Sequence, residues 1–142
     1  MSASEPLENQ RDGRKPAAGP QALQVSPVQA RLVLLVAALC VFGVALLPAP
    51  IEEPVLFGVD KLKHIAAFLV LTVLARAGWP SLRLWTLALG LTGFGVAIEL
   101  AQGLSGWGRT ASLADVIADL IGLGLGVALI DGVRRLRVRL RP

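Results

Sequence analysis

The chain has 142 residues, of which 54% are hydrophobic and 17% are charged. Since it contains no Tyr, adding its 15 Gly brings the apolar share to roughly 64%, whereas soluble domains have about 45–50% by the same convention. This composition excludes an ordinary soluble catalytic domain and predicts one small membrane domain, because too little polar surface remains to face water.

The formal net charge of +4 does not indicate a nucleic-acid-binding protein. The cationic residues flank apolar runs, and no aromatic stacking surface lies near them. The single cysteine, Cys40, excludes an intramolecular disulfide, and one Cys with one His gives no zinc-binding constellation. We therefore expect no metal and no cofactor.

Four apolar segments predict an all-α, polytopic membrane protein with a four-transmembrane-helix bundle. The chain divides into a disordered cytoplasmic tail, a membrane domain and a basic cytoplasmic tail, at residues 1–30, 31–133 and 134–142. The first tail is expected because prolines and scattered charges leave it too little apolar surface to offset its ordering entropy. Within the membrane domain we expect helices over residues 32–47, about 60–75, 84–101 and 112–130. A segment with three prolines, 48–54, separates the first two helices.

The cationic residues nearest the spans predict the orientation of the bundle. Because cytoplasmic loops carry the excess of Lys and Arg, both termini should face the cytoplasm. The proline-rich loop and the loop around Trp107 then face outward. Eleven of the 14 Lys and Arg fall on the cytoplasmic side of this topology: Arg11, Arg14, Lys15, Arg31, Arg76, Arg83, Arg134, Arg135, Arg137, Arg139 and Arg141.

Nine polar residues from three separate segments fall at the outward face and form the candidate site. The acids and the histidine recur at i, i+3 or i, i+4 spacings, so they can share helix faces that point into the bundle. Because a charge facing lipid costs at least about 2.5–3.5 kcal/mol near the bilayer centre, these groups should pair inside the bundle or line a wet pocket. They are Asp60, Lys61, His64, Glu99, Gln102, Arg109, Ser112, Asp115 and Asp119.

Three residues of this set, and Lys63 beside them, can also be explained by a structural role. Ser112 can cap the fourth helix, with Asp115 three residues on as the acid of a capping box. Lys61 and Lys63 are typical of residues that extend to the membrane interface instead of binding a ligand. These four positions therefore have an explanation that needs no ligand.

The deeper residues have structural alternatives as well. His64 can hydrogen-bond Asp60 one turn away or a group on a neighbouring helix, and Glu99 can form an ion pair with Arg109 that fixes helix packing. Asp119 is the hardest to explain in this way. It lies deepest, one turn below a second acid, where like charges repel and where Asn would serve a purely structural role.

Glycines in the third and fourth segments indicate close helix packing. Gly122 and Gly126 form a G-x-x-x-G face, and Gly90, Gly93 and Gly95 reduce the side-chain volume of the third segment. A phosphate-binding loop is excluded because no strand precedes these glycines. The same faces are candidates for a homo-oligomer contact.

The polar residues occur in three ordered motifs: Asp60-Lys61-x-x-His64-x-x-x-Phe68, Glu99-x-x-Gln102 and Arg109-x-x-Ser112-x-x-Asp115-x-x-x-Asp119-x-x-Gly122. Over residues 58–128 this order resembles the VanZ-like family of small bacterial membrane proteins. The family pattern has Asn where this chain has Asp119. The resemblance implies a multi-pass protein of the bacterial inner membrane, and the founding member of the family is associated with resistance to the glycopeptide teicoplanin.

Our leading hypothesis is a non-enzymatic cell-envelope protein whose outward pocket binds an amphiphile: a lipid headgroup, an envelope precursor or a lipophilic or glycopeptide drug, with an effect on antibiotic susceptibility. Arg109 would meet an anionic group, with His64, Glu99 and Gln102 hydrogen-bonding around it. One alternative is an intramembrane hydrolase or transferase that uses His64 or Glu99 as general base, with Asp119 or Asp115 positioning a nucleophile or a metal, although no nucleophile motif is present. Another is a small proton-coupled carrier.

The predicted topology can be tested with single cysteines. We expect Thr110→Cys to react with a membrane-impermeant thiol reagent in intact cells and Ser81→Cys to remain unlabelled, because the first lies in an outward loop and the second in a cytoplasmic one. Cys40→Ala removes the background. Labelling at position 81 alone would invert the orientation.

Overall fold

The computed structural model describes residues 25–48 and 58–140, and these residues are all-helical apart from short connections. The predicted disordered tail up to residue 24 and most of the proline-rich loop (49–54) lie outside the described residues. The helices are α1 (Pro27–Ala45), α2 (Val59–Gly78), α3 (Leu84–Ser105) and α4 (Leu113–Arg139).

Helix α1 begins five residues earlier than the apolar run that predicted it. Ser26 and Gln29 form a capping box: the Ser26 hydroxyl accepts from the Gln29 N–H at 3.2 Å, and the Gln29 side chain accepts from the Ser26 N–H at 2.9 Å. Pro27 occupies the first helical position, where its fixed φ suits the helix and its missing N–H costs nothing. Residues 27–30, which we assigned to the tail, therefore belong to the helix.

The other helices also extend beyond their predicted ends. Helix α2 continues to Gly78, and α3 continues to Ser105, where Gly106 closes it with a left-handed backbone (φ 67°). Helix α4 runs to Arg139, so most of the basic segment 134–142 is helical. Cationic side chains in a last helical turn interact favourably with the negative end of the helix dipole, which explains why this polar sequence continues the helix.

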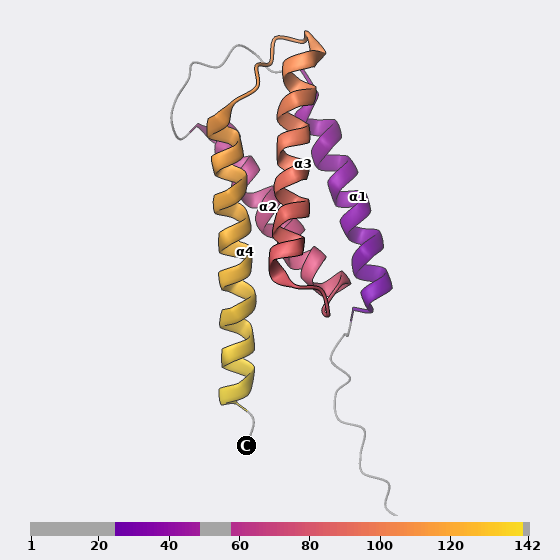
Figure 1. The fold of residues 1–142 in the computed structure, drawn as a ribbon, viewed down its shortest axis with the longest axis vertical. Coiled ribbons are helices and arrows are strands. Elements are labelled where there is room, and N and C mark those ends of the chain that lie inside the picture. The colour runs from indigo at the N-terminus through magenta and orange to yellow at the C-terminus, as the bar shows by residue number, and fades with distance from the viewer. Residues whose placement is uncertain (1–24, 49–57, 141–142) are drawn as a thin grey trace, which may run out of the picture.

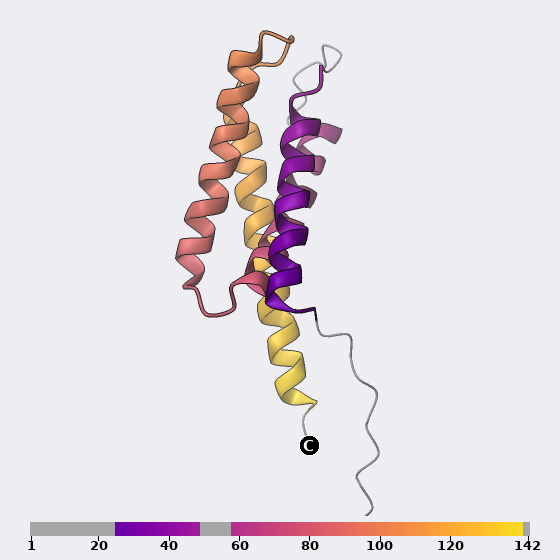
Figure 2. The same ribbon diagram turned by 90° about the vertical axis from the view of Figure 1, so that its right-hand side faces the viewer.

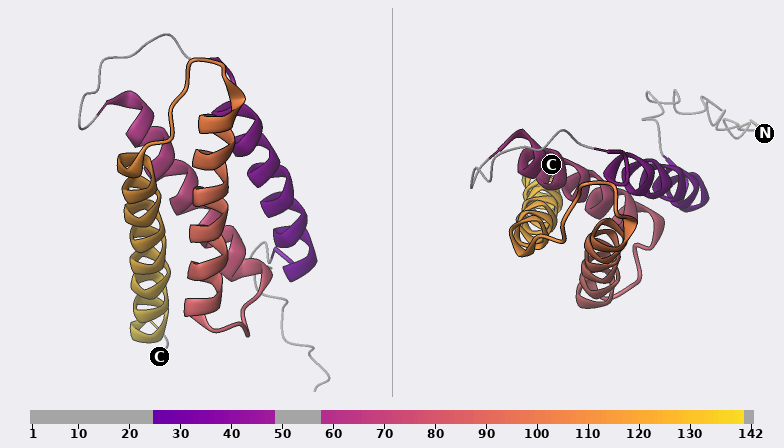
Figure 3. Two further views of the ribbon diagram at one scale, coloured as in Figure 1. Left: turned by 45° about the horizontal axis from the view of Figure 1, so that its top comes forward. Right: turned by 90° about the horizontal axis from the view of Figure 1, so that it is seen from above.

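The four helices alternate in direction, and α2 lies in the middle of the arrangement (Figures 1 and 3). Helix α2 contacts each of the other three, whereas α1 and α4 do not approach each other. The largest fully buried apolar side chains are Phe68 and Leu71 of α2 and Ile98 of α3. The start of α1 and the end of α4 lie at one end of the bundle, and α4 projects beyond the α2–α3 turn there (Figure 2).

Two glycines let α4 approach the backbone of α2. A Cβ at Gly122 would collide with the carbonyl oxygen of Ile65, and one at Gly126 would lie 2.7 Å from Cβ of Thr72. The predicted packing role of these two residues is thus confirmed, and the packing takes place within one chain. Gly90 and Gly93 of α3 have no neighbour within 4 Å, so their predicted packing role is not seen in the described part of the chain.

Three of the helices, α1, α3 and α4, are long and apolar enough to cross a membrane. Large apolar side chains cover their outer surfaces, and Leu35 and Leu39 of α1, for example, are 58% and 63% exposed. Exposed apolar area of this extent is unfavourable in water and is expected for helices in contact with lipid. The chain is therefore a helical membrane protein with three candidate spans.

The glycine contact between α2 and α4 can be tested by adding one methyl group. We predict that Gly122→Ala lowers the free energy of unfolding in detergent by about 1–3 kcal/mol, because the new Cβ overlaps the α2 backbone. The matched control is Gly124→Ala, at an exposed site with no neighbour within 4 Å. Equal melting temperatures for the two variants would contradict the packing shown here.

Candidate functional site

All nine predicted site residues lie at the end of the bundle where α2 begins, α3 ends and α4 begins. Five of them are buried: His64, Glu99, Gln102, Asp115 and Asp119. We call the nine residues the polar cluster. They come from three helices and the α3–α4 loop, and the contacts below join them to one another and to the end of α1.

His64 and Asp119 form the most deeply buried pair of the cluster. The Nδ1 atom of His64 lies 2.8 Å from Oδ1 of Asp119, which is only 2% exposed. An ionised carboxylate can only accept hydrogen bonds, so Nδ1 is the donor when Asp119 is ionised, and Nε2 takes no part in this contact. Of the two structural alternatives predicted for His64, the hydrogen bond to Asp60 is not formed and the hydrogen bond to a neighbouring helix is. The absence of a side chain at Gly95 makes room for the Asp119 carboxylate, because a Cβ there would lie 2.5 Å from Oδ2.

Glu99 joins the end of α3 to the start of α4. Its Oε2 accepts a hydrogen bond from the backbone N–H of Ser112 at 2.6 Å, so a buried carboxylate caps the N-terminus of α4. The capping box that we predicted is wrong, because the Ser112 hydroxyl makes no capping hydrogen bond. Carboxylates are favourable near helix N-termini, and Glu99 supplies from a neighbouring helix what Ser112 and Asp115 were expected to supply locally.

Arg109 pairs with Asp60, and the predicted Glu99–Arg109 ion pair is absent from the described residues. Nη1 of Arg109 lies 3.8 Å from Oδ2 of Asp60, and Nε donates to the carbonyl oxygen of Leu47 at 3.1 Å. Gln102 donates to the carbonyl oxygen of Ala45 at 2.9 Å. Both side chains therefore satisfy carbonyl groups at the end of α1, which have no helical partner. These two contacts could not be predicted from the sequence, because every residue has a backbone carbonyl and no side-chain pattern marks the one that accepts a hydrogen bond.

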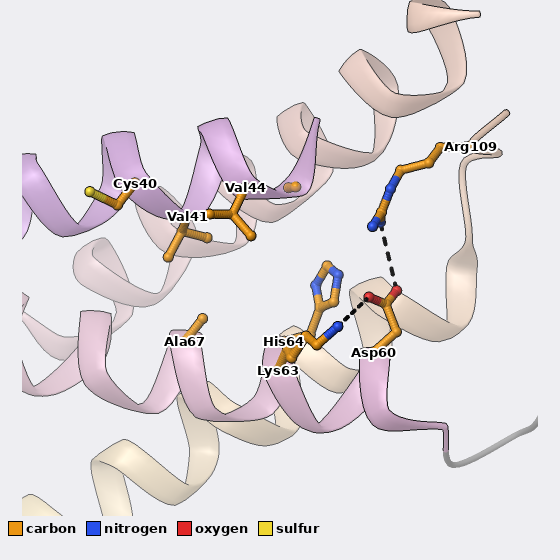
Figure 4. A pocket seen from close by; sticks show the side chains of 9 residues that line it. Cys40, Val41, Val44, Asp60, Lys63, His64, Ala67 and Arg109 are labelled. Carbon is orange, nitrogen blue, oxygen red and sulfur yellow. Dashed lines mark ion pairs between the residues drawn. The ribbon is translucent and has the colours of Figure 1, made fainter. Parts of the chain in front are cut away.

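A cavity of about 250 Å³ opens between α1 and the first half of α2 (Figure 4). Its α1 wall is apolar and includes Val41 and Val44, whereas its other wall carries Asp60, Lys63, His64 and Arg109. Two parts of this cavity were not predicted from the sequence. We had interpreted Lys63 as an interface residue, and no sequence pattern could place α1 opposite these polar groups.

Three buried carboxylate oxygens of the cluster have no hydrogen-bond partner among the described residues: Glu99 Oε1, Asp115 Oδ1 and Asp119 Oδ2. The Asp115 oxygen forms an ion pair with Lys61, whose Nζ lies 3.5 Å away. A buried acceptor left unsatisfied costs about 1–3 kcal/mol, and more when it is charged. A network that served stability alone would be expected to satisfy these atoms, so they indicate a site that is completed by a ligand or by water.

The arrangement permits two kinds of chemistry. Asp60, His64 and Asp115 each place one potential metal-binding atom within 4.8 Å of the other two. His64, oriented by Asp119 and lining the cavity, also has the geometry of a general base. A nucleophile for such a base is not evident in the described residues, because the Cys40 side chain points away from His64 (Figure 4) and Ser105 donates to the carbonyl of Gln102.

The two capping models predict opposite rankings of stability. We expect Glu99→Ala to lower the free energy of unfolding by about 1.5–3 kcal/mol, because it removes a hydrogen bond to a charged acceptor. Ser112→Ala should change it by less than about 0.5 kcal/mol, because the backbone N–H that donates is unaffected. Thermal melting in detergent measures both. A loss in Ser112→Ala with a neutral Glu99→Ala would show that the hydroxyl is the cap.

Comparisons with known proteins identify no relative of the chain: no family model, no curated protein and no solved structure matches it. The similarity to the VanZ-like family therefore rests on the three motifs. In this structure the motif residues lie together at one end of the bundle, and this placement enters the proposal below.

Proposed function

We propose that this chain is a four-span membrane protein of the VanZ-like kind that binds the headgroup of an anionic amphiphile in an outward-facing pocket. The observation that carries the proposal is the cavity between α1 and α2, which has an apolar wall on one side and charged side chains on the other. A ligand with an alkyl chain and a charged group matches both walls, because each part finds the surface that suits it.

The alternation of the helices supports a fourth span. Helix α1 ends at the end of the bundle that holds the polar cluster, and α3 begins at the opposite end (Figure 1). If α1 and α3 both cross the membrane, the segment between them must cross it as well. Helix α2 has 20 residues, which gives it a length of about 30 Å, close to the thickness of the hydrocarbon layer.

The distribution of arginine supports an orientation with both termini in the cytoplasm. Arg31 and Arg76 lie at the end opposite the polar cluster, where Arg31 donates to the carbonyl of Gly78 and Arg76 to that of Leu82. The last turns of α4 add four more arginines at that end. Because Lys and Arg accumulate on the cytoplasmic side, the polar cluster and its cavity face outward in this proposal.

The contacts of Arg109 and Lys63 support an anionic headgroup as the ligand. Each lies near a different oxygen of Asp60, at 3.8 Å and 4.0 Å, which is longer than a charge-assisted hydrogen bond. Both cations therefore remain available to a phosphate or carboxylate at the cavity. Val41 and Val44 then provide a surface for the alkyl chain.

A second candidate function is an intramembrane hydrolase or transferase. The hydrogen bond between His64 and Asp119 favours it, because an oriented imidazole is the usual general base. Glu99, the other base considered, is occupied by the N–H of Ser112. The proton-coupled carrier is less favoured, because the described buried ionisable groups gather at one end and form no relay across the bundle. The VanZ-like resemblance adds an effect on glycopeptide susceptibility to the leading proposal.

Lipid analysis of the purified protein tests the proposal. We expect wild type to co-purify with a selected anionic amphiphile, and Arg109→Ala to lose at least about tenfold of that enrichment, since removing one charge-assisted contact costs about 1.5–3 kcal/mol. Arg83→Ala, at the opposite end of the bundle, is the matched control and should retain the ligand. An identical, unselective lipid profile in all three proteins, measured by mass spectrometry, would contradict pocket binding.

A further inference from the structure

We propose that Asp60, His64 and Asp115 form a binding site for one divalent metal ion of the Zn²⁺ or Mn²⁺ type, with Asp119 as the residue that positions His64. This inference goes beyond the binding of an amphiphile and does not require it. The sequence analysis predicted no metal. The ligands come from two helices and only one of them is a histidine, so they form no metal-binding pattern that can be seen in the sequence.

The spacing of the three side chains suits a single ion. Their potential ligand atoms all lie within 4.8 Å of one another. Around a tetrahedral zinc ion with ligands at about 2.0–2.2 Å, neighbouring ligand atoms lie about 3.3–3.6 Å apart, so the three side chains would have to approach one another by about an ångström to bind one ion. The close contact of Gly122 with Ile65 holds α2 and α4 together beside His64, which fixes the two sources of ligands relative to each other.

Asp115 provides an independent indication that the cluster can bind a further cation. It is 8% exposed, and its buried Oδ1 has no hydrogen-bond partner in the described part of the chain. The nearest cation, Nζ of Lys61, is 3.5 Å away, which gives Coulomb attraction without a hydrogen bond. A metal ion at the shared position would give this buried oxygen the direct contact that the ion pair with Lys61 does not provide.

The contact between His64 and Asp119 has the form of an outer-shell contact at metal sites. Nδ1 is hydrogen-bonded to the Asp119 carboxylate at 2.8 Å, which leaves Nε2 as the nitrogen that can bind an ion. Metal-binding histidines almost always donate their other ring N–H to a carboxylate, a carbonyl or water, which fixes the ring and increases its basicity. This role also explains an ionisable residue at position 119, since it needs a strong acceptor at a depth where a lone acid would be costly.

The charges of the cluster leave room for a dication. Four carboxylates, from Asp60, Glu99, Asp115 and Asp119, face three cationic side chains, from Lys61, Lys63 and Arg109, so negative charge is in excess while His64 is neutral. A bound dication would change this formal sum from −1 to +1. Asp60 and His64 also line the cavity, so a bound ion would keep positions open to it for water or for an anionic group.

The donor set limits the type of metal. One imidazole and two carboxylates suit Zn²⁺ and Mn²⁺, whereas Cu(I) prefers thiolates and Ca²⁺ takes oxygen ligands alone. Cys40 lines the far part of the cavity and points away from Asp60 and His64 (Figure 4), so a thiolate does not complete the site.

Titration of the full chain in detergent with Mn²⁺ tests the site, after treatment with a chelator and with free Mn²⁺ measured by electron paramagnetic resonance. We expect one Mn²⁺ per chain, displaced by Zn²⁺. Asp115→Asn and His64→Gln should each weaken binding by at least about 100-fold, because each removes a ligand, and Asp119→Asn by about 10–100-fold, because it removes only the positioning contact. Asp131→Asn, an acid of α4 far from the cluster, is the control and should bind as wild type does.

The outcomes distinguish this inference from the amphiphile proposal. Arg109→Ala should retain Mn²⁺ while losing the lipid, and Asp115→Asn should lose Mn²⁺; gel filtration and helical circular dichroism confirm that each variant is folded. Wild type that binds no Mn²⁺ or Zn²⁺ stoichiometrically overturns the metal site, as does a folded Asp115→Asn that binds it undiminished. Selective lipid binding in metal-free wild type would leave the amphiphile proposal intact in either case.

Discussion

The close contact between α2 and α4 is the constraint on which the rest of the structure depends. At Gly122 and Gly126 the absence of a side chain lets α4 approach the α2 backbone near Ile65 and Thr72. In a lipid environment apolar side chains gain little by meeting each other, so helices associate through close packing and polar contacts. The glycines provide the first, and the adjacent His64–Asp119 hydrogen bond provides the second.

Helix α1 is held at one end to α2 and at the other to α3 by hydrogen bonds to backbone carbonyls. At one end Arg31 donates to Gly78 and lies over the ring of Trp79, and at the other Gln102 donates to Ala45. The cavity opens between α1 and α2 near the second of these ends. Its apolar wall is thus a face of α1 that the neighbouring helices leave uncovered, and its charged wall is the first half of α2.

The polar cluster combines structural and ligand-binding roles in neighbouring residues. Glu99 and Gln102 satisfy backbone groups at helix ends, so they hold α4 and α1 in place. Asp60, His64 and Asp115 interact with other side chains, not with backbone groups at helix ends, and their potential ligand atoms converge. Combining the two roles in one buried site reduces the number of charges that a membrane protein must bury, and each buried charge needs a partner. It also means that loss of function in a variant of Glu99 reports on folding as well as on binding.

The sequence by itself determined the helical class, the membrane environment and the gathering of polar residues at one end, because apolar length and helical spacing are properties of single segments. The Ser26–Gln29 capping box was also readable, although we began the first helix after it. Only the tertiary structure decided which polar groups pair. Three contacts join positions on different segments: Asp119 with His64, Glu99 with Ser112 and Arg109 with Asp60. The last two replaced pairings that sequence proximity or charge favoured, whereas for His64 the sequence left Asp60 and a neighbouring helix both open. The physical reason is that helix rotation and approach, set here by Gly122 and Gly126, fix partners across segments, and no local pattern carries that information.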